Sequence, residues 1–384
     1  MLELQSKLPS QGVTIFSVMT ELAHRLNALN LSQGFPDFPA PPALLEALSQ
    51  ATLSGYNQYP AGDGVLALRE QLATQFIQRD QLQLDPATEI TITSGATLAI
   101  FCAIQACIHA DDEVIIFDPS YDSYAPAVQL AGGKSIHINL EAPHFEVDWQ
   151  QVKDRISTKT RMIIVNTPHN PTGAIWSKQD WLQLIELIQD KNIVVLSDEV
   201  YEHLVFDGQK HYSALQFPEL RDRSYVIGSF GKTYHVTGWK TGYCVASPQL
   251  MRLFRQVYQF TNFCGNTPCQ LALAHYMQHY PEHIQELPHF YQAKRDLFNQ
   301  QIQNSRFNFI PSQGTYFQSL DYTAIRPDLN DVAMCQFLAE QHKIVAIPIS
   351  VFYRQPPESQ RLIRFCFAKK DETLQQAGHI LMQC

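Results

Sequence analysis

Hydrophobic and polar positions follow two different periods along this chain. Short apolar runs bounded by turn residues predict strands, and longer stretches with helical spacing predict amphipathic helices. Strands are predicted at 89–93, 113–117, 161–165 and 193–196. Helices are predicted, for example, at 96–109 and 178–189. Strands that alternate with helices indicate a largely parallel sheet with helices on both faces, so the predicted fold class is α/β.

One segment interrupts this alternation near the start of the chain. Residues 35–42 are rich in proline, but helical periodicity resumes at 43–53, so the segment is predicted to be an ordered bend. The chain shows no internal repeat and no low-complexity segment.

Composition narrows the possible classes of protein. With 384 residues, 45% hydrophobic and 17% charged, the chain can bury a large core in two or three domains. A net charge of −9 argues against a nucleic-acid surface. Residues 1–9 contain no apolar run of signal-peptide length and no later run could span a bilayer, so we expect a cytoplasmic protein that binds no membrane. Eight cysteines include no Cys-x-x-Cys pair and no Cys/His cluster, so neither a metal site nor a disulfide is predicted.

Lys232 is the most informative single residue. It follows a predicted strand at 225–227, has Ser229 just before it and Lys240 after it, and could form a Schiff base while its neighbours hold a phosphate. These features predict a pyridoxal phosphate site. The alternative is a P-loop, because Gly-Lys-Thr at 231–233 resembles the end of a Walker A motif, but Val226 stands where that motif requires a glycine.

Two further motifs carry polar groups at strand ends. An apolar strand runs into Asp198, with Tyr201 three residues on, and a buried carboxylate there needs a cation such as a protonated pyridine ring. Asn170 lies in a turn with two prolines and a glycine after another strand. Taken alone, the aspartate could equally be a helix cap and the Asn-Pro pair only a turn.

Taken in order, these motifs resemble the fold-type I, class I pyridoxal-phosphate aminotransferases over nearly the whole chain. The matching motifs are Asn-Pro-Thr-Gly from Asn170, Asp-Glu-Val-Tyr from Asp198, Ser-Phe-Gly-Lys ending at Lys232, and the later Lys240. Finer motifs at 32–38, 118–124, 314–317 and 362–367 are similar to the kynurenine aminotransferase group, and within it to the bacterial methionine aminotransferases.

The resemblance implies two domains. The large domain, with a mostly parallel sheet between helices, should bind pyridoxal 5′-phosphate and span 47–276. An N-terminal arm and a smaller α/β domain should comprise 1–46 and 277–384.

The cofactor contacts are assigned mainly from the resemblance. The segment 91–97 leaves a strand and enters a helix, whose N-terminus favours an anion, so the phosphate is assigned there, although Gly95 alone could be a plain turn glycine. Asp198 should bind the ring nitrogen. The remaining predicted contacts are Ala96, Thr97, Ser229 and Lys240 with the phosphate, Tyr121 stacked on the ring, and Asn170 and Tyr201 with the phenolate oxygen. From the sequence alone, Tyr121 could also be a core tyrosine.

Catalysis and substrate binding are assigned in the same way. Lys232 should carry the Schiff base and, once released, move the proton from the substrate. Arg364 should bind the substrate α-carboxylate with Asn170 and the backbone of Gly34, although it could instead be an edge-strand arginine reaching to solvent. Tyr59 should reach the phosphate of a neighbouring subunit, which implies a homodimer; otherwise it is a loop aromatic.

The predicted activity is transfer of an amino group from methionine, aromatic or other neutral amino acids to a 2-oxo acid. Aspartate-preferring relatives use a second arginine after the lysine, but no lysine or arginine lies between Arg255 and Lys294. Phe16, Tyr59 and Tyr121 could line an apolar pocket. Three alternatives stay open: a cysteine-conjugate β-lyase, a ligand-sensing regulator without catalysis, and a scaffold without cofactor.

Overall fold

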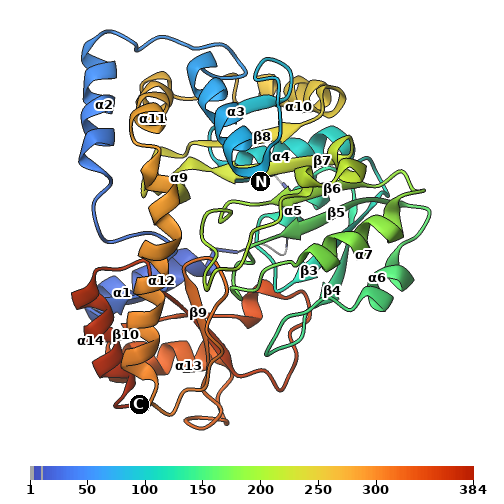
Figure 1. Ribbon diagram of the computed structural model, residues 1–384. Coiled ribbons are helices and arrows are strands. Elements are labelled where there is room, and N and C mark those ends of the chain that lie inside the picture. Colours follow the sequence, from blue (N-terminus) through green and yellow to red (C-terminus); the bar gives the residue numbers. More distant parts are fainter. Residues whose placement is uncertain (1–3, 10–11) are drawn as a thin grey trace.

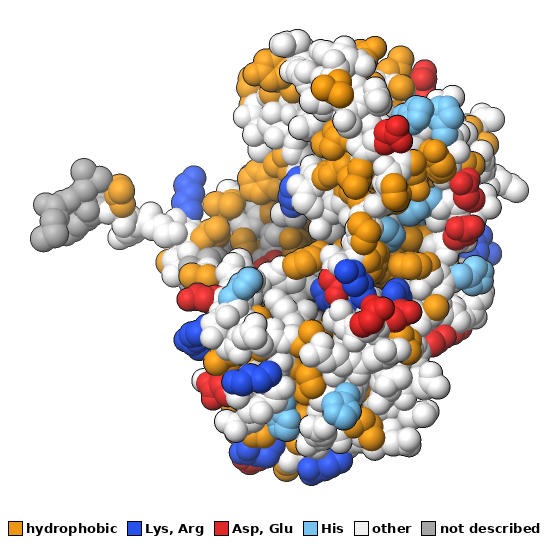
Figure 2. Space-filling model, turned by 90° about the vertical axis from the view of Figure 1, so that its left-hand side faces the viewer, with side chains coloured by type: hydrophobic (Ala, Val, Ile, Leu, Met, Phe, Trp, Pro, Cys, Tyr) orange, Lys and Arg blue, Asp and Glu red, His pale blue; other side chains and the backbone are white. Residues whose placement is uncertain are grey.

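The computed structural model describes residues 4–9 and 12–384. The chain forms an upper and a lower part, and helix α12 (Glu282–Ile302) runs from one to the other (Figure 1). Figure 2 shows hydrophobic side chains gathered around a hollow between these two parts.

The upper part is built on a seven-stranded sheet. Its strand order is β2-β8-β7-β6-β5-β3-β4. Their bounds are β2 (Ile90–Thr93), β3 (Glu113–Asp118), β4 (Lys134–Asn139), β5 (Thr160–Asn166), β6 (Val194–Asp198), β7 (Ser224–Ser229) and β8 (Gly242–Ala246). Strand β8 runs antiparallel to both of its neighbours, whereas the other pairs are parallel.

Helices cover both faces of this sheet because successive strand residues point to opposite sides. Ile163 belongs to the hydrophobic cluster that includes α2 (Pro42–Leu53), α3 (Leu66–Asp80), α7 (Lys178–Ile188) and α11 (Thr267–His279). Ile164, the next residue, belongs to the cluster with α4 (Ala96–Cys107), α5 (Tyr124–Leu130) and α10 (Pro248–Thr261). The predicted α/β class, with a mostly parallel sheet between helices, is confirmed.

The lower part has a hydrophobic core of its own, to which α12 also contributes. A three-stranded antiparallel sheet has the order β11-β12-β9, and β1 pairs in parallel with β10. These elements are α1 (Ile15–Leu26), β1 (Leu29–Asn30), β9 (Phe317–Asp321), α13 (Asp331–Phe337), β10 (Ile344–Val345), β11 (Ile347–Pro348), β12 (Leu362–Cys366) and α14 (Asp371–Leu381). The predicted domain boundaries at 46/47 and 276/277 stay a prediction.

Short helices complete the chain, and the predicted element bounds shift by small amounts. The short helices are α6 (Trp149–Arg155), α8 (Pro218–Arg221) and α9 (Phe230–Thr233). The helix predicted at 43–53 begins at Pro42, because proline fits the first helical turn. The helix predicted to reach residue 109 ends at Cys107. Among the described residues, no helix combines the length and the apolarity needed to cross a membrane.

Candidate functional site

A cavity of about 210 Å³ lies at the carboxyl ends of β5, β6 and β7 and the N-terminus of α4. Polar strand-end residues are therefore brought together from segments far apart in sequence, as expected for an open α/β sheet. Nine of the predicted site residues line this cavity: Ala96, Thr97, Tyr121, Asn170, Asp198, Tyr201, Ser229, Lys232 and Lys240.

One end of the cavity is built to hold an anion. Gly95 has φ +88°, a conformation that suits glycine, and it delivers the chain into α4 with the free backbone N–H groups of its first turn. A Cβ at position 95 would lie 3.2 Å from Cε of Lys240 and 3.4 Å from its Nζ. The lysine ammonium and the helix N-terminus therefore act on the same space. Thr97 Oγ1 lies 3.2 Å from the Tyr121 hydroxyl at this end.

Asp198, at the end of β6, is a buried carboxylate that requires a cation as its partner. Its side chain is 4% exposed, and burial raises the pKa of this carboxyl to about 6. Tyr124 Oη donates to Oδ2 at 2.5 Å, and the Val200 N–H donates to Oδ1 at 3.3 Å. A protonated ring nitrogen bound here would supply the missing positive charge.

Lys232 lies between these two ends. It is carried by the single turn of α9 directly after β7, and its Nζ donates to the Gly34 carbonyl at 3.2 Å. Burial, with the positive charges of Lys240 and Arg364, lowers the pKa of Lys232 to about 8. A substantial fraction of the amine is therefore neutral near physiological pH, as a nucleophile or a base requires.

Arg364 is fully buried in β12, with an exposed fraction of 0%. Its Nη1 donates to Asn170 Oδ1 at 2.7 Å and its Nη2 to the Ser32 carbonyl at 2.9 Å. The guanidinium carbon lies 3.9 Å from the centre of the Phe317 ring. Burial lowers the pKa of Arg364 to about 10, which still leaves it charged at neutral pH.

This arginine has no carboxylate partner among the described residues, and its Nε has no hydrogen-bond partner there. A buried cation in this state is costly unless an anion completes it. A substrate carboxylate would do so.

Three predicted residues lie outside the cavity lining: Arg364, described above, Gly34 and Tyr59. The Gly34 carbonyl reaches the site by accepting hydrogen bonds from Lys232 and from the Tyr316 hydroxyl, the latter at 2.6 Å. Tyr59 is 82% exposed, and its ring packs edge-on against Phe263 at 5.3 Å. The role of Tyr59 in a neighbouring subunit stays a prediction.

Two residues that hold the site together, Tyr124 and Asn166, were not predicted from the sequence. Tyr124 contacts Asp198, as described above. Asn166 lines the cavity, donates through Nδ2 to the Asp198 carbonyl at 2.9 Å and accepts from the Asn170 N–H at 2.8 Å. Asn166 directly follows the strand predicted at 161–165, and this position at a strand end was a signal in the sequence. In the structure it ends β5 and pairs in register with Asp198 at the end of β6.

The groups present fit pyridoxal 5′-phosphate. The α4 N-terminus and Lys240 suit its phosphate, Asp198 suits its ring nitrogen, and the Lys232 amine suits its aldehyde. The Asn170 Oδ1 atom is engaged by Arg364, so its Nδ2 amide is the group that could donate to the phenolate oxygen.

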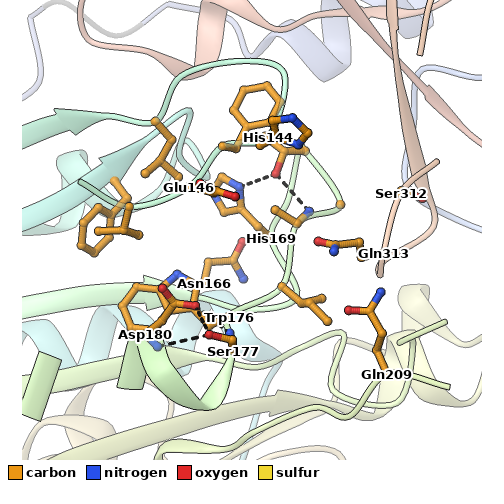
Figure 3. Close-up of a pocket in the computed structure, with 18 of the residues that line it drawn as sticks. His144, Glu146, Asn166, His169, Trp176, Ser177, Asp180, Gln209, Ser312 and Gln313 are labelled. Atoms are coloured by element: carbon orange, nitrogen blue, oxygen red, sulfur yellow. Dashed lines mark hydrogen bonds between the residues drawn. The ribbon is translucent and has the colours of Figure 1, made fainter. Parts of the chain in front are cut away.

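A larger cavity, of about 880 Å³, lies on the other side of the wall formed by Tyr124 and Asn166. Figure 3 shows His169 in this cavity, between His144 and Ser177. His169 Nδ1 lies 2.7 Å from Thr172 Oγ1, and burial lowers the pKa of this histidine to about 4. Ser177 and Asp180 form a reciprocal helix cap. Several polar groups of this cavity, including those of His169, Ser177 and Asp180, are thus bonded within the protein, and no predicted site residue among those described lines it.

Among the described residues, one trio could hold a metal ion by geometry alone: Glu199, Glu202 and His211, whose ligand atoms lie within 4.8 Å of one another. His211 Nε2 lies 2.8 Å from Glu199, and Glu202 is bonded to both Arg79 and Tyr243. These partners account for the buried carboxylates as a polar network. The predicted absence of a metal stays a prediction.

Comparison with known proteins places this geometry in a family. A family model described as aminotransferase class I and II matches residues 27–381. The chain is 48% identical to a methionine aminotransferase from Escherichia coli, over 99% of this chain and 98% of that protein. It is 35% identical to human kynurenine–oxoglutarate transaminase 3, over 94% of this chain and 86% of that protein. A solved E. coli structure, reported with a methionine aminotransferase function, matches with a TM-score of 0.98 over 100% of both chains, at 48% identity.

Proposed function

The chain belongs to the class I and II aminotransferases. We propose that it transfers the amino group of methionine, and of aromatic or other neutral amino acids, to a 2-oxo acid. It is a pyridoxal-phosphate-dependent aminotransferase of fold type I. Its substrates are an amino acid and a 2-oxo acid.

When bound, the cofactor supplies an electron sink that makes the substrate Cα–H bond acidic. We assign Lys232 as the base that takes and returns this proton, because its amine lines the cavity and has a lowered pKa. Asp198 holds the proton on the ring nitrogen. Asn170 and Tyr201 are assigned to orient the ring through its phenolate oxygen, with Tyr121 against its face.

The setting of Arg364 is the observation that carries the proposal. A fully buried guanidinium that donates only to neutral oxygens, and that has no carboxylate within 4 Å among the described residues, selects a ligand that brings its own negative charge. Every amino acid and 2-oxo acid carries an α-carboxylate, and a planar guanidinium can bind it through two parallel hydrogen bonds. Arg364 therefore accounts for a site that accepts many side chains but requires this one group.

Methionine as the preferred donor draws support from three sources. The E. coli relative carries that name. No lysine or arginine occurs between Arg255 and Lys294, so the second charge of a dicarboxylate lacks its usual partner. Aromatic rings surround Arg364, with Phe16 and Phe352 centred 5.7 and 5.5 Å from its guanidinium carbon, and sulfur–aromatic contact favours a thioether.

The test is a comparison of kcat/KM for methionine, phenylalanine and aspartate with one fixed 2-oxo acid. We expect methionine first and aspartate last. Aspartate in first place would contradict the assignment of the side-chain pocket, while leaving the aminotransferase activity itself intact.

We also propose a homodimer in which Tyr59 completes the phosphate site of the other subunit. Two further large aromatic side chains are exposed close to it: Phe263, which its ring contacts, at 54%, and Tyr56, three residues before it, at 57%. Such a patch is typical of a surface covered in an assembly. Mixed dimers of Lys232→Ala and Tyr59→Phe subunits test this, since one unimpaired site should form only if Tyr59 acts across the interface. The cytoplasmic location and the two domain boundaries stay predictions.

A further inference from the structure

The Asp198 carboxylate receives its shortest hydrogen bond from a separate element of the fold. Tyr124, the first residue of α5, donates through its hydroxyl to Oδ2 at 2.5 Å. Both side chains are almost fully buried, at 2% and 4% exposed. The other described donor to this carboxylate, the Val200 N–H, lies 3.3 Å from Oδ1.

We propose that Tyr124 is a positioning residue for the reaction: its hydroxyl keeps the Asp198 carboxylate charged and aimed into the cofactor cavity. Tyr124 does not line that cavity among the described residues, so it acts through Asp198 and not on the reacting atoms. The proposal rests on the proposed function, because Tyr124 positions Asp198, the residue assigned to the ring nitrogen of the cofactor.

The electrostatic surroundings explain why a hydroxyl donor matters here. Burial disfavours the charged form of Asp198, and the nearby Glu199 carboxylate adds repulsion, whereas Lys232 attracts. A hydrogen bond donated to a carboxylate favours its charged form. Tyr121 and Tyr201 also face Asp198, but Tyr124 is the tyrosine that bonds to it. Burial and the Asp198 charge raise the pKa of Tyr124 well above its ordinary value, so it remains a protonated donor.

The position of the ring adds a second part to this role. Tyr124 lines the larger cavity while its hydroxyl reaches Asp198, so its side chain spans the wall between the two cavities. Asn166, labelled in Figure 3, belongs to the same wall. The hydroxyl thus supplies a fixed hydrogen-bond donor, and the ring stands between the larger cavity and the carboxylate.

The test is Tyr124→Phe, which keeps the ring and its edge-on contact with Tyr121 at 5.7 Å. The apoprotein is titrated with pyridoxamine 5′-phosphate between pH 5 and pH 9, because this probe binds without a covalent bond to Lys232. Asp198 must be charged to hold the ring nitrogen, so affinity falls on the acid side. Without the Tyr124 donor we expect the midpoint of that fall to move up by about one pH unit, with affinity recovering at higher pH.

The matched control is Tyr225→Phe. Tyr225 is also fully buried, belongs to the same hydrophobic cluster as Tyr124 and donates its hydroxyl to the Leu250 carbonyl at 2.9 Å. Its loss should cost similar stability and leave the midpoint in place. In an Asp198→Asn background, Tyr124→Phe should no longer move the pH profile.

The outcomes separate the two proposals. If wild-type protein binds the probe and transaminates methionine but Tyr124→Phe keeps the wild-type midpoint, or shifts no more than Tyr225→Phe, the positioning role is wrong and the proposed function stands. If wild-type protein neither binds the probe nor transaminates, both proposals fail. In the holoenzyme, a lower kcat with an unchanged KM for Tyr124→Phe supports the role, because Arg364 still binds the substrate.

Discussion

The two cavities on either side of Tyr124 and Asn166 differ in whether their buried polar groups already have partners within the protein. In the larger one, of about 880 Å³, the buried His169 already bonds to Thr172, and burial lowers the pKa of this histidine so that it is neutral at pH 7. The smaller one, of about 210 Å³, brings an amine and a carboxylate with shifted pKa values into one space. Beyond it, Arg364 is a buried cation with no carboxylate within 4 Å among the described residues.

The volume of a cavity alone is therefore a poor guide to its function. A folded chain loses stability when it buries a charge without a partner. Such charges persist where a ligand completes them. The smaller cavity is therefore the reactive one, and four substitutions test this difference.

The largest effect is expected from Lys232→Ala. Turnover should be abolished, since the amine that bonds the cofactor and moves the proton is gone. Cofactor should still bind noncovalently, because the α4 N-terminus and Lys240 remain, but borohydride should no longer fix it to the protein. Lys294→Ala, which removes a lysine paired with Asp371 at 2.7 Å, is the control. A reducible adduct in Lys232→Ala would mean that another lysine carries the cofactor.

Arg364→Ala should come next. Losing a desolvated two-point contact costs about 2–4 kcal/mol, or roughly 30- to 1000-fold in kcat/KM, for every amino acid and 2-oxo acid alike. Steady-state kinetics with several donors measures this. Arg326→Ala, which removes an arginine paired with Asp328, should change nothing. Equal KM values for wild type and Arg364→Ala would exclude the carboxylate role.

Asp198→Asn should make the apoprotein more stable while it damages catalysis. The pKa of Asp198 is raised from its ordinary value near 4 to about 6, so the charged form costs stability above pH 6, and this cost disappears as the pH falls below 4. At pH 8 the asparagine variant should gain about 1–3 kcal/mol in the free energy of unfolding. Urea unfolding at pH 8 and pH 4 measures this, with the exposed Asp190→Asn as control. A gain that is equal at both pH values would contradict the pKa shift.

The smallest effect is expected in the larger cavity. Gln183 lines it, and Gln183→Ala should leave kcat/KM for methionine within about twofold and stability within about 0.5 kcal/mol. A tenfold loss of activity would show that this cavity takes part in the reaction.

Much of this arrangement could be predicted from the sequence. Local periodicity placed the strands within two residues, and the motifs around Asn170, Asp198 and Lys232 led to the family, the fold class and the cofactor, all of which are confirmed. Strand-end residues are predictable because parallel strands end at one edge of the sheet.

The rest depends on packing between distant segments. The reversed direction of β8 leaves no mark in its hydrophobic pattern. Tyr124 lies 74 residues from Asp198 in sequence, and their contact exists because α5 begins beside the end of β6. Its place three residues after Tyr121 was a weak hint, since that spacing equally suits a tyrosine of the core.

One hydrogen-bonded chain runs from the Arg364 guanidinium to the backbone of Asp198. Arg364 donates to Asn170, the Asn170 backbone donates to Asn166, and Asn166 donates to the Asp198 carbonyl. For enzyme engineering, this means that a substitution at Asn166 or Asn170 would disturb both the grip on the carboxylate and the hold on the ring. New substrate ranges are better sought in the apolar wall at Phe16, which touches the arginine without belonging to that chain.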